Sequence, residues 1–562
     1  MRRILVLALL VALGCLLWLD LRPPGRTLYF GGPIVTLDDE ASVASAVLVE
    51  GDRILAVGSE SELSAQGGQN ARRVDLAGRA LLPGFIDAHG HFPGEGVFAV
   101  MVDLNSPPIG TIRTLDELLE RLRERAAEKS AGEWIIGMGY DDTLLAEGRH
   151  PTREDLDRAS SEHPIVITHI SAHLVALNSR GLELAGIDAQ TPDPEGGVIR
   201  RKEGSGEPDG VLEESALELL ADVVPTPGLM DGIRIVREAS RRYVAAGVTT
   251  AQSGYTAKPL MQLLPLMVRT GLAQVRLVLW PGMEVVDQML DDGDTWESYD
   301  EQWVRGGAVK LIADGSIQGY TGYLSEPYFV PPGEDPDYSG YPRILRDELI
   351  ERVTRYHAAG YQIAVHGNGD ASIDEILDAF EIAQRENPRE GTRHIVIHAQ
   401  MARDDQLERM KALGVIPSFF SLHTYYWGDR HREIFMGPER AARMSPAGSA
   451  ARMGLRFTIH ADSPVVPMEP LRLVWAAVNR VSSSGQSMGE AQRVSVLQAL
   501  RAVTIDAAYQ HFEEADKGSI EPGKLADLVI LSESPLDRPE RIDEIRVLET
   551  IIGGRTVFRA EE

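Results

Sequence analysis

Short apolar runs alternate with amphipathic segments along most of the chain. Helical patterns separate these runs, and such alternation predicts βα units around a parallel sheet. The candidate strands are Gly84–Ala88, Val248–Ser253, Arg276–Trp280, Ala308–Ala313, Gln362–His366, Ile395–His398, Gly414–Ser418 and Leu455–His460. Eight parallel strands are enough to close a barrel, so we expect an α/β fold of the (β/α)8 TIM type.

The two ends of the chain have a different pattern, in which short strands are joined by turns. Candidates are Thr27–Leu37, a hairpin of Ala46–Val49 with Ile54–Val57 around Gly51-Asp52, and, near the C-terminus, Leu525–Leu531 and Val547–Ile552. Neither end is long enough to form a stable stack of sheets alone. We therefore expect residues 27–82 and 513–562 to pair in one small composite β-sandwich beside a barrel of residues 83–512.

The segment between the first two predicted barrel strands is too long for one crossover. It contains amphipathic helical patterns, such as Leu115–Lys129, and a Pro/Gly-rich run, Thr191–Gly210, that predicts a loop. We expect residues 94–243 to form an inserted α/β subdomain that covers the active site.

Residues 1–26 have the pattern of a targeting segment. Arg2 and Arg3 precede an apolar run that ends at Leu19, which is typical of a signal peptide or a signal anchor. Cys15, at the end of Ala12-Leu13-Gly14-Cys15, also resembles the lipidated cysteine of a bacterial lipoprotein. We expect export to the periplasmic or cell-surface side with tethering to the membrane, by a signal anchor or by lipid on Cys15.

Charge and cysteine content narrow the chemistry. The chain has 56 basic and 84 acidic residues and a formal net charge of -28, which argues against nucleic-acid binding because phosphate would be repelled. Cys15 is the single cysteine. An intramolecular disulfide and a cysteine-based metal site are therefore excluded, and any metal must be held by His, Asp, Glu or a modified Lys.

Ligand-type side chains lie at or near the ends of the predicted strands. His89 and His91 follow the first strand, and at i and i+2 both imidazoles can reach one metal. The other candidates are His366, His398 and Asp462, at the ends of later strands, where the active sites of βα barrels lie. Lys310 lies earlier in an apolar strand, where a cation is costly to bury. The lysine could be neutral, or it could be carbamylated by CO2.

The ordered set His89-x-His91, Lys310, His366, His398 and Asp462 resembles the amidohydrolase superfamily. The resemblance extends to its family 3 branch, which includes N-substituted formamide deformylases. Supporting matches are Asp314-Gly315-Ser316, the segment from Arg149 to Asp157, and the closing run from Gly518 to Val529.

This resemblance implies a divalent metal site with two ions, although one ion is not excluded. Zinc is the first choice for imidazole and carboxylate ligands. His89 and His91 would hold one ion and His366 and His398 the other, with Lys310 bridging as a CO2-derived carbamate. Asp462 would contact a metal or accept the proton of the bound water.

The implied activity is hydrolysis of a non-peptide C–N bond in a small-molecule amide or N-formyl or N-acyl amine. A metal-bound hydroxide would attack, with Asp462 as general acid and base. The same site could serve an ester, a lactone or a cyclic amide, or a metal-assisted isomerisation. A third alternative is a catalytically inactive surface protein with a binding or regulatory role. A homodimer is left open.

Three further histidines are candidate substrate contacts. By the resemblance, His173 lies in the roof over the pocket. His423 could bind the substrate carbonyl, although aromatic residues replace the glutamine that this branch commonly has before its histidine. His460 stands where the family more often has glycine, and could line the pocket, support a ligand or simply pack in a strand.

The segment Gly139-Tyr140-Asp141-Asp142 precedes another histidine pair. Asp141 and Asp142 could reach the rim of the pocket, but we expect a solvated loop. His169, four residues before His173, is a weaker candidate for a metal ligand.

Overall fold

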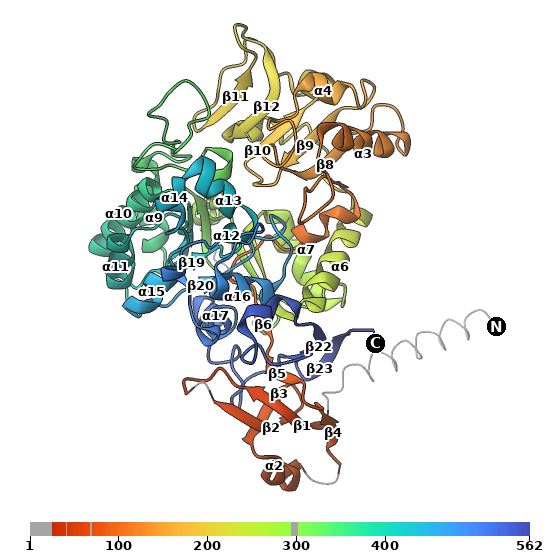
Figure 1. Ribbon diagram of the computed structural model, residues 1–562, viewed down its shortest axis with the longest axis vertical. Coiled ribbons are helices and arrows are strands. Elements are labelled where there is room, and N and C mark those ends of the chain that lie inside the picture. Colours follow the sequence, from red (N-terminus) through yellow and green to blue (C-terminus); the bar gives the residue numbers. More distant parts are fainter. Residues whose placement is uncertain (1–24, 41, 68–69, 294–301, 562) are drawn as a thin grey trace, which may run out of the picture.

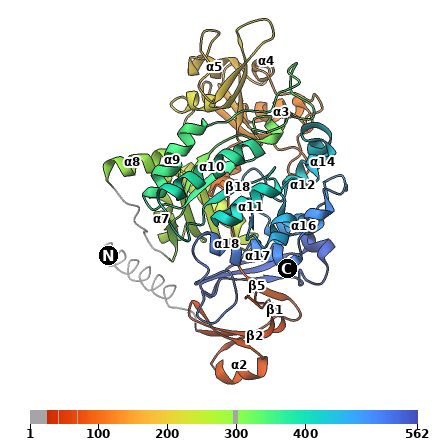
Figure 2. The same cartoon turned by 90° about the vertical axis from the view of Figure 1, so that its left-hand side faces the viewer.

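The computed structural model describes residues 25–40, 42–67, 70–293 and 302–561. Three sheet regions follow one another along the long axis, and the parallel strands occupy the middle (Figure 1). A view from the side keeps the same order (Figure 2). The predicted targeting segment falls on residues 1–24, which lie outside the described part of the chain. Within the described part, no helix has both the length and the apolarity to cross a bilayer.

A sheet at one end of the molecule contains both ends of the chain. Its strands are β1 (Arg26–Val35), β2 (Val43–Glu50), β3 (Arg53–Gly58), β4 (Arg72–Asp75), β5 (Ala80–Pro83), β21 (Leu528–Leu531), β22 (Val547–Ile552) and β23 (Arg555–Arg559). The predicted hairpin around Gly51-Asp52 is present as β2 and β3. Antiparallel pairing of β5 with β21 joins the two halves.

The parallel strands form two adjoining sheets. One contains β6 (Phe85–Ile86), β13 (Val248–Thr256), β14 (Arg276–Pro281) and β15 (Val304–Gly306); the other contains β16 (Val309–Ile312), β17 (Ile363–Gly367), β18 (Ile395–His398), β19 (Ile416–Phe419) and β20 (Thr458–Ile459). Each of the eight predicted runs thus contains a strand, and β15 is additional. A bridge between Gly282 and Lys310 links the sheets on one side. On the other side the Asp462 N–H donates to the His89 carbonyl at 3.2 Å.

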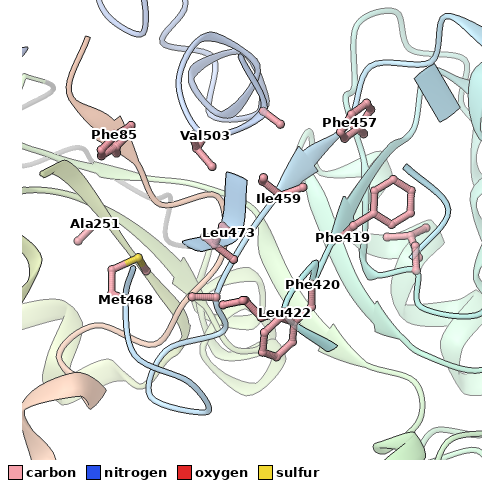
Figure 3. Packing of buried hydrophobic residues seen from close by; sticks show 14 of the residues in the cluster. Phe85, Ala251, Phe419, Phe420, Leu422, Phe457, Ile459, Met468, Leu473 and Val503 are labelled. Carbon is pink, nitrogen blue, oxygen red and sulfur yellow. The ribbon is translucent and has the colours of Figure 1, made fainter. Parts of the chain in front are cut away.

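The apolar side chains of these strands explain why their sequences are almost continuously hydrophobic. Phe85, Phe419 and Ile459 are buried, and they pack with Phe457 and Val503 in the same cluster (Figure 3). Helices such as α9 (Arg346–Ala358), α10 (Asp370–Glu386) and α11 (Asp404–Leu413) lie outside the parallel strands (Figure 1). Both faces of a parallel sheet are covered, so apolar side chains on either face are buried. Each fully buried Val, Leu, Ile or Phe side chain stabilises the fold by about 1.5–3 kcal/mol.

The inserted segment forms a sheet of its own. It contains β7 (Val102–Asp103), β8 (Ile135–Tyr140), β9 (Ile165–His169), β10 (Leu174–Leu177), β11 (Gly197–Arg201) and β12 (Pro208–Glu214), and it packs on α3 (Leu115–Ala127). The expectation of a loop over 191–210 is wrong in part, because β11 and the first three residues of β12 lie there. Pro208 is tolerated as the first residue of its strand. Gly197 has no room for a side chain, since a Cβ would lie 2.4 Å from the Ala216 nitrogen.

A buried ion pair joins the parallel strands to the terminal sheet. Arg276, the first residue of β14, binds both carboxylate oxygens of Asp527 at 2.7 and 3.0 Å. The same carboxylate accepts the Gly553 N–H at 2.8 Å. Asp527 belongs to the closing run that the sequence singled out, so this run holds the C-terminal strands against the first parallel sheet.

We predict that Asp527→Ala lowers the free energy of unfolding by about 3–5 kcal/mol, because it leaves the Arg276 guanidinium buried without the carboxylate that pairs with it. The measurement is the shift of the urea unfolding midpoint. The control is Glu50→Ala, which removes an ion pair with Arg26 whose side chains are 41% and 50% exposed, and it should cost less than about 1 kcal/mol. Equal shifts for the two variants would contradict a special role for the buried pair.

Candidate functional site

All six predicted ligand side chains lie in one cluster at the end of the parallel strands. Asp462 is the common neighbour of three histidines. Its Oδ1 lies 3.3 Å from Nε2 of His89 and 3.2 Å from Nε2 of His91, and its Oδ2 lies 3.9 Å from Nε2 of His398. His366 Nδ1 is 3.2 Å from His398 Nε2. Lys310 comes early in β16, yet its Nζ is 3.0 Å from His89 Nε2.

Hydrogen bonds from behind fix the orientation of the first histidine pair. Nδ1 of His89 donates to Oε1 of Gln252 at 3.1 Å, and Nδ1 of His91 donates to the Gly254 carbonyl at 2.9 Å. With the protons on Nδ1, the lone pairs on Nε2 face Asp462. Such acceptors behind metal-binding histidines are a general feature of protein metal sites.

The arrangement around Asp462 fits a divalent cation. Its Oδ1 is buried, and among the described residues no donor offers it a hydrogen bond. This oxygen and the Nε2 atoms of His89 and His91 are all acceptors, and together they form a group that could hold an ion. Ligand atoms around a tetrahedral ion lie roughly 3.3 Å apart when each bond is about 2.0–2.1 Å. The observed separations of 3.2 and 3.3 Å match this spacing.

A second pair of acceptor nitrogens lies beside the first group. Nε2 of His366 lies 3.2 Å from the Gly315 carbonyl and 3.0 Å from Nδ2 of Asn368; when it donates to the carbonyl, Nδ1 is left as the acceptor. Nδ1 of His398 donates to Nε2 of His460 at 3.1 Å, and Nδ1 of His460 bonds to Oγ of Ser418 at 2.8 Å. His460 is completely buried. Its contacts therefore favour support of His398 over contact with a substrate.

Burial sets the charge states in the cluster. Together with cationic neighbours, it holds the pKa values of His89, His366 and His398 well below the usual range, so the rings are neutral acceptors. Burial also lowers the pKa of Lys310 to about 7, although the charge on Asp462 opposes that shift. For Asp462, burial would raise the pKa, but the surrounding histidines outweigh it and the carboxylate is ionised.

The other two histidines that were predicted to contact the substrate, His423 and His173, border the cluster. The His423 ring lies 6.2 Å from that of His398 and 4.1 Å from that of Phe420. Its Nδ1 is buried and has no hydrogen-bond partner among the described residues. The His173 ring, from the inserted sheet, lies 5.1 Å from that of His366. The site thus has walls from both the parallel strands and the insertion.

The expectation of a solvated loop at Asp141 and Asp142 is wrong. Asp141 is buried, and its Oδ2 accepts from Nε1 of Trp427 at 3.0 Å and Nη1 of Arg430 at 2.9 Å. Asp142 accepts from Nε2 of His169 at 3.1 Å. These two carboxylates and His169 form another group of ligand type, but each has a protein partner. Asp141 joins the inserted sheet to the segment after β19. Its partner Arg430 lies 289 residues away along the chain, so the sequence could not show this contact.

Two residues of the site were missed by sequence reasoning. Gln252 holds both the His89 ring and the Gly90 N–H, at 3.1 and 2.9 Å. A polar side chain within the apolar run Val248–Ser253 was the signal that could have found it. Glu214, which binds Nδ1 of His173 at 2.9 Å, lies just beyond a segment that was expected to be a loop, so no pattern pointed to it.

Comparison with known proteins gives consistent matches over nearly the whole chain. The family model described as the amidohydrolase family matches residues 72–558. The amidohydrolase YtcJ of Bacillus subtilis (strain 168) is 29% identical over 552 residues, covering 95% of this chain and 99% of the relative. The N-substituted formamide deformylase of Arthrobacter pascens is 29% identical over 535 residues, with 92% and 96% covered.

The solved structures agree with these matches. The crystal structure of an uncharacterized metal-dependent hydrolase from Pyrococcus horikoshii OT3 superposes with a TM-score of 0.72 at 26% identity, covering 92% of this chain and 99% of that chain. The related protein from Pyrococcus furiosus gives 0.69 at 27% identity. These neighbours imply an α/β fold of the TIM-barrel type.

We predict that His460→Ala lowers the affinity for Zn²⁺ by about 10- to 100-fold, because His398 loses the acceptor that orients it. Competition with a chelator of known affinity measures the change. The matched control is His163→Ala, which removes a buried histidine of the inserted segment whose side chain, among the described residues, bonds only to the Glu133 carbonyl. Wild-type affinity in the His460 variant would show that this ring does not support the site.

Proposed function

This chain belongs to the amidohydrolase family, and we propose that it hydrolyses a non-peptide C–N bond in a small-molecule amide or an N-formyl or N-acyl amine. One observation carries the proposal. The unpartnered Oδ1 of Asp462 faces two Nε2 lone pairs, beside a second pair of imidazole acceptors. Such a set of acceptors suits a cation, and a cation in this setting supports hydrolysis.

We propose zinc as the metal, with two ions per chain. His89, His91 and Asp462 would hold one, and His366 and His398 the other. The ions would supply Lewis acidity, which polarises the substrate carbonyl and acidifies water. Lys310 supports a bridging role as a carbamate, because burial lowers the pKa of its amine to about 7, so a substantial fraction is the neutral nucleophile that CO2 requires.

The residues of the chain supply the proton transfers. The Asp462 carboxylate is ionised, so one of its oxygens can accept a proton from the attacking water and return it to the leaving nitrogen. His423 offers a buried, unpartnered nitrogen beside His398, which suits a contact with the substrate carbonyl oxygen. Phe420 and Trp427 pack around that ring and favour a substrate with an apolar group.

The bond class is supported by the deformylase relative, whose name describes action on N-substituted formamides. Esters, lactones and cyclic amides would use the same ligands, and a panel of substrates separates them.

We further propose that the two parallel sheets form one closed (β/α)8 barrel, that residues 94–243 roof its site, and that both chain ends form the composite sandwich. Export through residues 1–26, with or without lipid on Cys15, also stays a prediction.

We predict that Lys310→Ala reduces the metal content from about two ions per chain to about one and lowers turnover of N-formyl and N-acyl amines by at least roughly 100-fold. Elemental analysis and initial rates, in protein purified with bicarbonate and without chelators, measure the two effects. Lys517→Gln is the matched control, since Lys517 is also buried but pairs with Glu513 at 2.8 Å.

Each part of the proposal can fail separately. One ion in both the wild type and the Lys310 variant would contradict the carbamate bridge. Two ions with no turnover of any amide, but with turnover of esters or lactones, would replace the C–N bond by a C–O bond. No metal at all would favour a binding role.

A further inference from the structure

A tight turn in the inserted sheet presents His173 to the metal-ligand cluster. The turn joins β9, which ends at His169, to β10, which begins at Leu174. Nδ1 of His173 lies 2.9 Å from Oε2 of Glu214, and the ring stands edge-on to His366, with 5.1 Å between the ring centroids. Among the described residues, no hydrogen bond engages Nε2 of His173. One ring nitrogen is therefore held and the other is available.

Glu214 binds His173, and among the described residues none of its hydrogen bonds goes to a proposed metal ligand. It is the last residue of β12 and is completely buried. Its N–H donates to the His173 carbonyl at 2.9 Å, so main chain and side chain bind the same residue. Its backbone has φ +50 and ψ -121. Such a conformation is uncommon for a non-glycine residue, and strain of this kind is found preferentially at functional sites.

The surroundings of Glu214 keep its carboxylate in place. Nη1 of Arg343 lies 3.3 Å from the oxygen that binds His173. Gly315, from the segment after β16, approaches so closely that a Cβ there would lie 2.2 Å from Oε1 of Glu214. An ionised carboxylate only accepts hydrogen bonds. The His173 nitrogen that faces it must then be the donor, so Nδ1 carries a proton, and in the neutral ring Nε2 keeps its lone pair.

We propose that Glu214 is a positioning residue that holds His173 in the Nδ1–H form, with Nε2 as an acceptor for the N–H of a secondary amide substrate. The inference rests on the proposed C–N hydrolase function and narrows its substrate class. A matched ester has no such N–H, so it would gain nothing from the oriented ring. A site that hydrogen-bonds one substrate group discriminates against analogues that lack it.

The test compares three single variants and one double variant, Glu214→Gln with His173→Ala, with the wild type. Glu214→Gln keeps the shape but replaces the carboxylate, and His173→Ala removes the ring. Glu213→Gln is the matched control, because Glu213 is a buried neighbour on the same strand that binds Arg200 and, at 3.1 Å, the Tyr341 hydroxyl. Rates are measured for an N-formyl amine and for the formate ester of the corresponding alcohol, and metal content is measured in parallel.

We expect Glu214→Gln to lower kcat/KM for the amide by about 10- to 100-fold, with unchanged metal content and a smaller loss for the ester. In the His173→Ala background, Glu214→Gln should add less than about a twofold effect, because the two residues act as one unit. The Glu213 variant should keep the wild-type ratio of amide to ester rates. Equal losses for amide and ester, an additive double variant, or an equal effect of Glu213→Gln would overturn the proposal.

A second readout does not depend on turnover. In protein labelled with ¹⁵N-histidine, the His173 signals, assigned by their loss in His173→Ala, should show a protonated Nδ1 and an unprotonated Nε2. Glu214→Gln should shift the balance toward Nε2–H, and Glu213→Gln should not. A wild type without hydrolytic activity but with this pattern would contradict the proposed function alone, whereas an Nε2–H ring in the wild type would contradict the role of Glu214.

Discussion

The site depends on one electrostatic constraint, which is that the imidazoles of His89, His91, His366 and His398 must all direct a lone pair toward the same region. A histidine can do this only if its other nitrogen has an acceptor behind it. His89 and His91 find one in Gln252 and the Gly254 carbonyl. Without those acceptors the rings could carry their protons on the inward nitrogens, and Asp462 would be hydrogen-bonded instead of available to a cation.

The parallel strands supply these acceptors through their pairing. His89 follows β6, and Gln252 lies in the adjacent β13. His366 lies in β17, and its acceptor, the Gly315 carbonyl, follows the adjacent β16. His460 follows β20, and Ser418 lies in the adjacent β19. His89, His91 and His366 are therefore oriented by groups from a neighbouring strand, whereas His398 in β18 is oriented by His460, two strands away. The strand order and register thus bring the ligands and their orienting groups together.

This difference between the ligands and the groups that orient them explains which site residues the sequence could predict. The ligands stand at the ends of apolar runs, and a local pattern reveals both the run and the polar residue that ends it. His89, His366 and His398 were found in this way. The orienting groups have no such signal, because a backbone carbonyl such as that of Gly315 can accept from any side chain that the fold brings near. Gln252 alone left a trace, as a polar residue in an apolar run.

The wrong expectations about Asp141 and about a loop over residues 191–210 have a related cause. Asp141 follows a glycine and a tyrosine and precedes another aspartate, which is a typical loop composition, and only its contact with Arg430 shows that it is buried. Glu214 ends a strand that begins in a Pro/Gly-rich run, where sheet formation depends on neighbours that are distant in sequence. Local propensity is overridden in both places by tertiary contacts.

Charged and polar pairs close to the site join the insertion to the parallel strands. Asp141 binds Arg430 and Trp427, in the segment that also carries His423, while Glu214 binds Arg343 beyond β16. None of these residues is a candidate metal ligand. Changes in the insertion can therefore reshape the substrate-facing wall through His173 while the acceptors around Asp462 stay intact. The candidate metal ligands and the wall formed by His173 thus lie in separate parts of the chain, coupled through a few buried carboxylates.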